Sequence, residues 1–259
     1  MYQTLQYEEN HFVVTVRLNR PEKKNSLNAQ MRGELGQLLR EIAEKPTVRV
    51  LIITGNEEIF CAGADIGEIH GTQSGEATYK HAREFQLLFD RLDTLPQPTI
   101  ATVSGYALGG GCELALATDF RIASNTARFG LPEIKIGAFP GGGGTQRLSR
   151  LIGIAKAKQM IYLGDPITAE EALNIGLVIN VVPKEKLMEE AMRLAQKLAK
   201  LPRLAMQASK MLINRSMELD LASGLELEAR TFGALATSHD LAEGTKAFME
   251  KRKPNFTGE

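Results

Sequence analysis

The sequence predicts an α/β fold with parallel strands, followed by a helical C-terminal region. Short, nearly all-apolar runs alternate with amphipathic stretches up to about residue 182, as in buried parallel strands joined by helices. Beyond Val182 the apolar residues recur at helical spacing only. We therefore expect an α/β core over residues 1–200, which carries the functional site, and a helical region over residues 201–259.

Four runs are expected to be strands of the core. The first alternates and is rich in β-branched residues, and the others are mostly apolar. They cover residues 12–18, 48–54, 99–103 and 120–123. Two longer helices are expected between them. One covers residues 28–44, where Met31, Leu35 and Ile42 recur at helical spacing, and the other covers residues 76–95.

Four helices are expected in the last part of the chain. They cover residues 184–200, 202–219, 221–237 and 239–252. Pro202 suits a first helical position, where a missing N–H is harmless. The third helix carries more apolar side chains than a solvated helix needs, namely Leu221, Leu225, Phe232 and Leu235. These side chains pack either on another subunit or on the chain's own core, and the sequence leaves both open.

Composition and charge exclude several classes of protein. Apolar residues make up 43% of the 259 residues, enough for a packed core, and 31 basic residues balance 31 acidic ones. No overall field therefore draws the chain onto nucleic acid or an anionic membrane. Neither a signal peptide nor an apolar stretch of about 20 residues is visible, so we expect a cytoplasmic protein that does not enter a membrane.

Cysteine and histidine give no sign of a metal site or a disulfide scaffold. The two cysteines, Cys61 and Cys112, stand in no metal-ligand pairing, and Cys112 suits a buried apolar position. No histidine pairs with a nucleophile motif. The four histidines, which we expect at the surface or in packing roles, are His11, His70, His81 and His239.

Two glutamates stand out because their neighbours carry few other charges. Glu113 follows the glycine-rich stretch 105–111, and Glu133 follows Pro132. A carboxylate in such surroundings is costly to desolvate unless it is paired or used. Two of them suggest a general acid/base pair that shares a pocket. The alternative for each is an acid in a first helical turn that complements the helix dipole.

Two glycine-rich segments offer backbone N–H groups to a ligand. A helix that begins near Gly109 or Gly110 presents unpaired N–H groups that can stabilise a developing anion. The small residues around Ala64 let a second N–H face the same ligand, and Asp65 with Glu68 fits an acidic variant of the capping box. The glycine run after Pro140 reads as a loop that leads into a helix. It lacks the Lys-Ser/Thr of a phosphate-binding loop, so nucleotide binding is rejected.

Taken together, these segments resemble the enoyl-CoA hydratase (crotonase) superfamily over essentially the whole chain. Six motifs carry the resemblance, in order along the chain. They are Asn19-Arg20-Pro21 with Asn25-Ser26-Leu27-Asn28, Phe60-Cys61-Ala62-Gly63-Ala64-Asp65, the stretch from Gly105 to Glu113, Leu131-Pro132-Glu133, the stretch from Pro140 to Arg147, and Glu243-Gly244 with the stretch from Ala247 to Arg252.

The resemblance implies a fold, an assembly and a reaction. The fold is a spiral of β-β-α units with a C-terminal helical region that builds homotrimers, commonly paired into hexamers. The substrate is an acyl-CoA thioester, whose carbonyl is held by the N–H groups of Ala64 and Gly110. Glu113 and Glu133 hold a water between them, with Glu113 activating it and Glu133 protonating Cα, and Gly141 helps to position it. The product is a 3-hydroxyacyl-CoA, and no metal or other cofactor is implied, since CoA enters with the substrate.

The same resemblance assigns two sets of contacts to CoA. The first set comprises Asn25, Ser26, Leu27, Ala64, Asp65, Ile66 and Gly67. The second comprises Phe248 and Lys251, which reach CoA from a neighbouring subunit in some members. Several hydratases carry lysine where this chain has Gly67, so a cationic contact to CoA is missing here.

Related activities on the same fold remain as alternatives. Many enoyl-CoA isomerases keep only the glutamate that matches Glu133, and the pair present here favours hydration. The stretches 60–65, 141–144 and 213–221 also look like the methylglutaconyl-CoA hydratase branch of leucine breakdown. RNA binding, known in that branch, is not expected because residues 30–45 carry balanced charge. Acyl-chain preference is expected to depend on residues 68–82.

Overall fold

The computed structural model describes residues 2–70 and 74–259, and its larger sheet has six strands. In spatial order they are β1 (Leu5–Asn10), β2 (Val13–Leu18), β3 (Val50–Thr54), β5 (Thr99–Val103), β7 (Phe120–Ser124) and β10 (Asn180–Val182). β1 and β2 form an antiparallel hairpin, and all the other pairs are parallel. The four predicted strands are β2, β3, β5 and β7, so the parallel core is confirmed.

A second, smaller sheet stands beside the first. Its strands, in spatial order, are β4 (Ile59–Cys61), β6 (Tyr106–Leu108), β8 (Arg128–Gly130) and β9 (Ile167–Thr168). β4, β6 and β8 run parallel, and β9 closes the edge antiparallel to β8. None of these strands was predicted, because two or three residues are too few to show a period-two pattern.

The chain winds as a spiral in which each turn adds one strand to each sheet and then a helix. β3 and β4 lead to α2 (Ile66–His70) and α3 (Gly75–Asp93), and β5 and β6 lead to α4 (Gly110–Leu116). β7 and β8 lead to the 3₁₀ helix η2 (Pro132–Ile136), α5 (Gly144–Ile152) and α6 (Ile154–Leu163). The expected spiral of β-β-α units is confirmed. The remaining helices of the core are η1 (Pro21–Lys23), α1 (Ala29–Glu44), α7 (Ala169–Asn174), η3 (Lys184–Lys186) and α8 (Leu187–Leu198).

The larger sheet is buried on both faces, which explains its almost continuous apolar strands. Every residue of β3 and of β5 is buried. On one face Leu187, Ala191 and Ala195 of α8 pack on Val50 and its apolar neighbours. The other face belongs to the main core, which α1 and α3 cover. Parallel sheets are usually covered on both faces, because the helices that connect their strands pack against the sheet.

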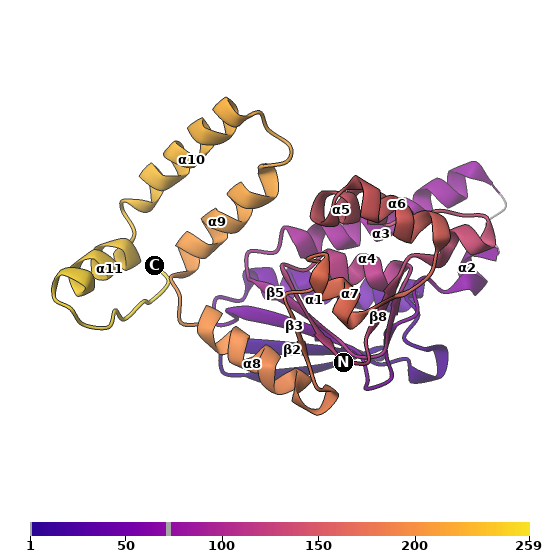
Figure 1. Cartoon of the computed structure of the whole chain (residues 1–259). Coiled ribbons are helices and arrows are strands. Elements are labelled where there is room, and N and C mark those ends of the chain that lie inside the picture. Colours follow the sequence, from indigo (N-terminus) through magenta and orange to yellow (C-terminus); the bar gives the residue numbers. More distant parts are fainter. Residues whose placement is uncertain (1, 71–73) are drawn as a thin grey trace.

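The last three helices extend to one side of the core (Figure 1). They are α9 (Arg203–Arg215), α10 (Leu221–Leu235) and α11 (His239–Met249). Pro202 is the N-cap of α9 rather than its first residue, so that placement was off by one position. The stretch 184–200 divides into η3 and α8. No helix in the described part of the chain is long and apolar enough to cross a membrane.

The expected capping box at the start of α2 is wrong. The Asp65 carboxylate does accept from the Gly67 N–H, at 3.3 Å. Glu68, however, turns away from Asp65 and caps the neighbouring helix α1, because it accepts from the Ala29 N–H at 2.7 Å and pairs with Arg32 at 2.7 Å. Of the segment 68–82, residues 71–73 lie outside the described residues, as does the side chain of His70.

Candidate active site

Three neighbouring parallel strands of the smaller sheet end at the same edge, and each leads into a predicted site residue. Ala64 follows β4, Gly110 follows β6, and Glu133 follows β8. The carboxyl ends of parallel strands are where α/β folds collect ligand-binding groups. Residues that are far apart in the sequence therefore meet here because their strands are adjacent.

The backbone N–H groups of Ala64 and Gly110 lie side by side. A methyl group placed on Gly110 would stand 3.2 Å from Ala64 N, and one on Gly63 would stand 3.2 Å from Gly110 N. Gly63 has φ 106° and Gly109 has φ 52°, a region that side chains disfavour. In the described part of the chain neither of the two N–H groups has a hydrogen-bond acceptor. The pair can therefore receive an oxygen from a ligand, as an oxyanion hole does.

Glu113 is buried on α4, with 4% of its surface exposed, and a glycine loop holds it in place. Its Oε1 accepts from the N–H groups of Gly142, at 2.9 Å, and Gly144, at 2.8 Å. Burial raises the pKa of this carboxyl, while the two N–H groups and the charge of Arg147 oppose that rise. The contacts favour the ionised form and leave Oε2 for another partner.

Glu133 stands on the short helix η2 and is less firmly held. Its Oε2 is buried without a hydrogen-bond partner in the described chain, and its Oε1 lies beside Gly109. Burial raises the pKa of Glu133 to about 7, and the nearby charge of Glu113 adds to the rise. Such a carboxyl is a good proton donor near neutral pH.

The structure brings most of the first set of predicted CoA contacts together, but they differ in accessibility. Asn25 has none of its surface exposed, and its side chain is used internally: it accepts from the Arg20 N–H at 2.9 Å and donates to the Phe60 carbonyl at 3.2 Å. Leu27 is equally buried and bridges to Ala64 through its backbone. Ile66 and Gly67 are exposed beside them.

Asp65 and Ser26 also belong to an internal network. Asp65 pairs with Arg20 at 3.2 Å, and the same guanidinium donates to the Ser26 carbonyl at 2.7 Å. This network ties segment 20–28 to the loop that carries the Ala64 N–H. Phe248 in α11 and Lys251 just after it lie away from this segment, because α11 and α2 are on opposite sides of the molecule (Figure 1). Phe248 is 86% exposed.

Helix α3 supplies residues of the site that the sequence analysis missed. Gln86 donates to the Gly141 carbonyl at 2.8 Å, and Ala82 also lies against Gly141. The rings of Phe85 and Phe89 pack beside Gly110 and Gly142. Their helical spacing predicts a buried face but gives no sign of which site that face meets.

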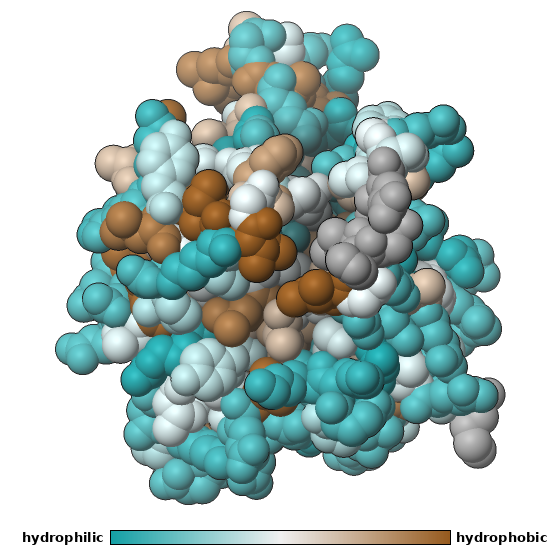
Figure 2. All heavy atoms as spheres, turned by 90° about the vertical axis from the view of Figure 1, so that its right-hand side faces the viewer, coloured by the Kyte–Doolittle hydropathy of each residue, from teal (hydrophilic) through white to brown (hydrophobic). Residues whose placement is uncertain are grey.

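The face that carries α2 has an apolar area. Figure 2 shows apolar atoms gathered in the middle of this face, among hydrophilic surroundings. Several large apolar side chains close in sequence to Ala64 and Glu133 are solvent-exposed, namely Ile66, Ile134, Ile136 and Phe139. Such surface suits an apolar ligand chain more than water.

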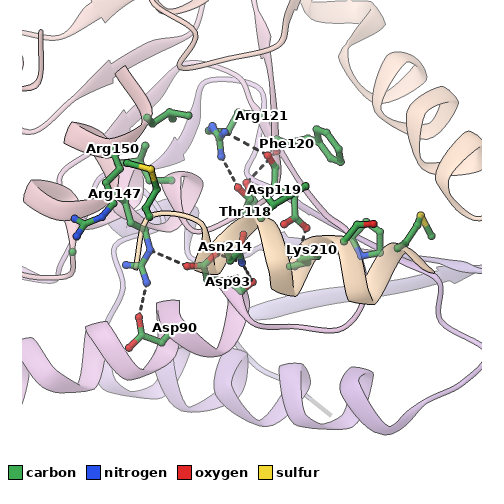
Figure 3. Close-up of a pocket in the computed structure, with 18 of the residues that line it drawn as sticks. Asp90, Asp93, Thr118, Asp119, Phe120, Arg121, Arg147, Arg150, Lys210 and Asn214 are labelled. Carbon is green, nitrogen blue, oxygen red and sulfur yellow. Dashed lines mark hydrogen bonds and ion pairs between the residues drawn. The ribbon is translucent and has the colours of Figure 1, made fainter. Parts of the chain in front are cut away.

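A cavity of about 1030 Å³ lies elsewhere, between α9 and the core (Figure 3). Its wall from the core carries Asp93, Asp119 and Arg147, and its wall from α9 carries Lys210 and Asn214. Neither of the two glutamates lines it. This cavity could not be predicted from the sequence, because its walls come from segments that are far apart along the chain.

Comparison with known proteins agrees with this geometry. The model of the family described as enoyl-CoA hydratase/isomerase matches residues 8–259. Crotonyl-CoA hydratase of Syntrophomonas wolfei is 41% identical over 260 residues, covering 98% of each chain. 2,3-dehydroadipyl-CoA hydratase of Escherichia coli is 43% identical over 246 residues, covering 95% of each chain.

The three-dimensional fold is shared as well. The solved structure of an enoyl-CoA hydratase from Bacillus anthracis superimposes with a TM-score of 0.94 at 41% identity, covering 99% of this chain and 100% of that chain. The matches extend over nearly the full length in both sequence and fold. The chain therefore belongs to the enoyl-CoA hydratase/isomerase family.

Proposed function

We propose that this protein is an enoyl-CoA hydratase, a hydro-lyase that adds water across the 2,3 double bond of a trans-2-enoyl-CoA to give a 3-hydroxyacyl-CoA. One observation carries the proposal: two carboxyl groups, that of buried Glu113 and that of partly buried Glu133, lie near each other beside two N–H groups that have no acceptor in the described part of the chain. The names of the relatives, which are hydratases, support the same reaction.

The thioester carbonyl binds to the N–H groups of Ala64 and Gly110 in this proposal. Addition at Cβ develops an enolate, whose oxygen carries the negative charge. Two fixed donors stabilise that charge without reorganising, and in other oxyanion holes one donor contributes about 3 kcal/mol. Neither N–H group has an acceptor among the described residues, which supports this assignment.

The two glutamates divide the proton transfers. Glu113, held by two N–H groups, accepts a proton from the water, whose oxygen bonds to Cβ. Glu133, whose pKa is raised to about 7, delivers a proton to Cα. The Gly141 backbone helps to position the water. The step moves a proton and a hydroxyl but no redox electrons, so the proposal uses no redox cofactor, and CoA enters as part of the substrate.

CoA lies along two segments in this proposal. Ser26 and residues 64–67 offer backbone and small side chains at the mouth of the site. Asn25 and Leu27 shape that segment from inside, because both are fully buried. Phe248 and Lys251 come from a neighbouring subunit, since within one chain they lie far from α2 (Figure 1).

The assembly we propose is a homotrimer or a dimer of trimers, built by residues 201–259 on a core of residues 1–200. No residue of α9 or α10 is buried within the single chain, although α10 carries Leu221, Leu225 and Phe232, which are more than half exposed. A second copy that covers these side chains explains their apolar character. A cytoplasmic location and the absence of RNA binding remain predictions.

The test follows the loss of the conjugated-enoyl absorbance of crotonoyl-CoA. Wild-type protein is expected to hydrate it, and Glu113→Gln and Glu133→Gln are each expected to lower kcat by about 10²–10⁴-fold. Both variants should still bind an acyl-CoA, measured by calorimetry. Near-normal turnover in either variant would overturn the role of that glutamate.

The same assay addresses the preferred acyl chain. 2,3-dehydroadipyl-CoA and 3-methylglutaconyl-CoA are measured beside crotonoyl-CoA. A preference for 3-methylglutaconyl-CoA would move the protein to the branch that acts in leucine breakdown. Isomerisation without hydration would point to the isomerase alternative.

A further inference from the structure

Arg147 on α5 links the loop that holds Glu113 to the end of α3. Its Nη1 donates to the Gly142 carbonyl at 3.3 Å. Its Nη2 donates to Asp90 Oδ1 at 2.5 Å, and its Nε lies 3.5 Å from Asp93 Oδ2 (Figure 3). The side chain is only 17% exposed, so these contacts are partly shielded from water.

The backbone of Gly142 is therefore held at both its N–H group and its carbonyl group. Its N–H donates to Glu113 and its carbonyl accepts from Arg147. The following residue, Gly143, has φ 115°, a region that only glycine adopts without strain. A loop with this freedom needs side-chain contacts to fix it, and Arg147 supplies one directly beside the catalytic carboxylate.

The chain of contacts continues into the C-terminal region. Asn214 of α9 donates to the Asp93 carbonyl at 3.1 Å and to its Oδ1 at 3.2 Å. Lys210, one turn earlier on α9, pairs with Asp119 of the core at 2.8 Å. Figure 3 shows these pairs around the cavity between α9 and the core. Helix α9 thus holds Asp93, which lies beside Arg147.

Charge adds a second link between Arg147 and Glu113. The titratable and charged groups near this carboxyl are Glu133 on η2, the Cys112 thiol on its own helix, and Arg147 on α5, whose own partners are Asp90 and Asp93 on α3. Arg147 is the cation among them, and its charge lowers the pKa of Glu113 against the effect of burial.

We infer that Arg147 is a positioning residue for Glu113, and that the contact of α9 with Asp93 helps to fix the position of the Arg147 side chain. This inference rests on the proposed hydratase function and adds a coupling between the C-terminal region and the catalytic base. Arg147 orients the glycine loop, and the loop orients the carboxylate that activates the water.

The test compares Arg147→Met with Arg150→Met. Arg150 lines the same cavity from the same helix, but among the described residues it bonds only to Gln146. Arg147→Met is expected to loosen the glycine loop and displace Glu113. The displacement should lower kcat by about tenfold or more. The acid limb of the kcat profile should move to higher pH, because Glu113 loses its cation. Arg150→Met should keep wild-type kcat and profile, and Arg147→Lys, which restores the charge, should return the limb toward wild type.

A second variant works in the opposite direction. Asp93→Asn keeps Arg147 and removes one of its anionic partners, so the acid limb should move to lower pH. If Arg147→Met does not fold, as judged by circular dichroism and light scattering, the direction in which the acid limb moves in Asp93→Asn tests the inference by itself. An unchanged limb in Arg147→Met or in Asp93→Asn, or an equal shift in Arg150→Met, would overturn the inference. Absence of hydration by the wild type would instead contradict the proposed function.

Discussion

Glu113 and Glu133 are the same chemical group in two different surroundings, and this difference supports the separate roles that we propose for them. Burial raises the pKa of Glu113, but its carboxyl accepts from two backbone N–H groups and lies near Arg147, and these contacts oppose the rise. Glu133 keeps a buried oxygen without a partner in the described chain, which favours the protonated acid. A site that needs one base and one acid at the same pH is served by this difference.

The raised pKa of Glu133 predicts a pH-dependent stability. Its folded-state pKa is about 7 and its unfolded-state value is lower, so the folded protein binds this proton more tightly. Its contribution to stability is fully present below the unfolded-state pKa and is lost as pH rises through about 7. At pH about 8, ionising it destabilises the fold by at most about 3 kcal/mol.

Glu133→Gln is therefore expected to raise the melting temperature at pH about 8, and to change it little at pH about 4. Glu8→Gln, at an exposed position of β1 in the core, is the control and should be neutral at both values. An equal gain at the two pH values would contradict the assigned burial of the Glu133 charge.

At the scale of elements, the glycine loop before α5 is the part most sensitive to added volume. A methyl group on Gly142 would stand 2.6 Å from Glu113 Oε2 and 2.8 Å from the Phe89 ring. Both neighbours are fully or almost fully buried, so they have little room to move. The loop must shift instead, and it then loses its N–H contacts to Glu113.

Gly142→Ala is expected to lower kcat at least about tenfold, with a smaller effect on acyl-CoA binding. Gly33→Ala is the matched control, because nothing lies within 4 Å of the added methyl group on helix α1. It should leave activity unchanged and slightly stabilise the helix. Wild-type kcat in Gly142→Ala would show that the loop does not position Glu113.

The length of an element decided whether it could be predicted. Strands of five or six residues, such as β3 and β5, and α1 with its apolar stripe are evident from their own residues. The smaller sheet has strands of two or three residues. Too few positions remain for alternation, and pairing with neighbouring strands specifies them.

At the scale of the whole molecule, the C-terminal helices carry large apolar side chains that the single chain leaves exposed to solvent. Phe232 is 69% exposed and Leu221 78% exposed. The alternative that Leu221, Leu225 and Phe232 pack on their own core is wrong for this fold, whereas Leu235 is partly buried within the chain. α9 is nonetheless attached to the core through Lys210 and Asn214, so it holds a defined place beside the core.

Phe232→Asp is expected to reduce assembly without unfolding the core, because this side chain makes little contact within its own chain. Size-exclusion chromatography with light scattering should show a smaller particle with unchanged circular dichroism. Arg230→Asp, on the same helix, changes an exposed side chain without removing apolar surface and serves as the control. An unchanged assembly in Phe232→Asp would place the interface elsewhere.

The sequence by itself determined which residue types are candidates for the site and in which order they occur along the chain. Glu113 and Glu133, the glycine-rich stretches and the helical C-terminal region are local patterns, and a local pattern needs only its neighbours to be recognised. Only the tertiary structure decided how these residues are used. Gly142 reaches Glu113 across 29 residues of sequence, and Arg147 reaches Asp90 across 57. Burial, unpaired N–H groups and pKa shifts arise from such long-range contacts, so they exist only once the chain has folded.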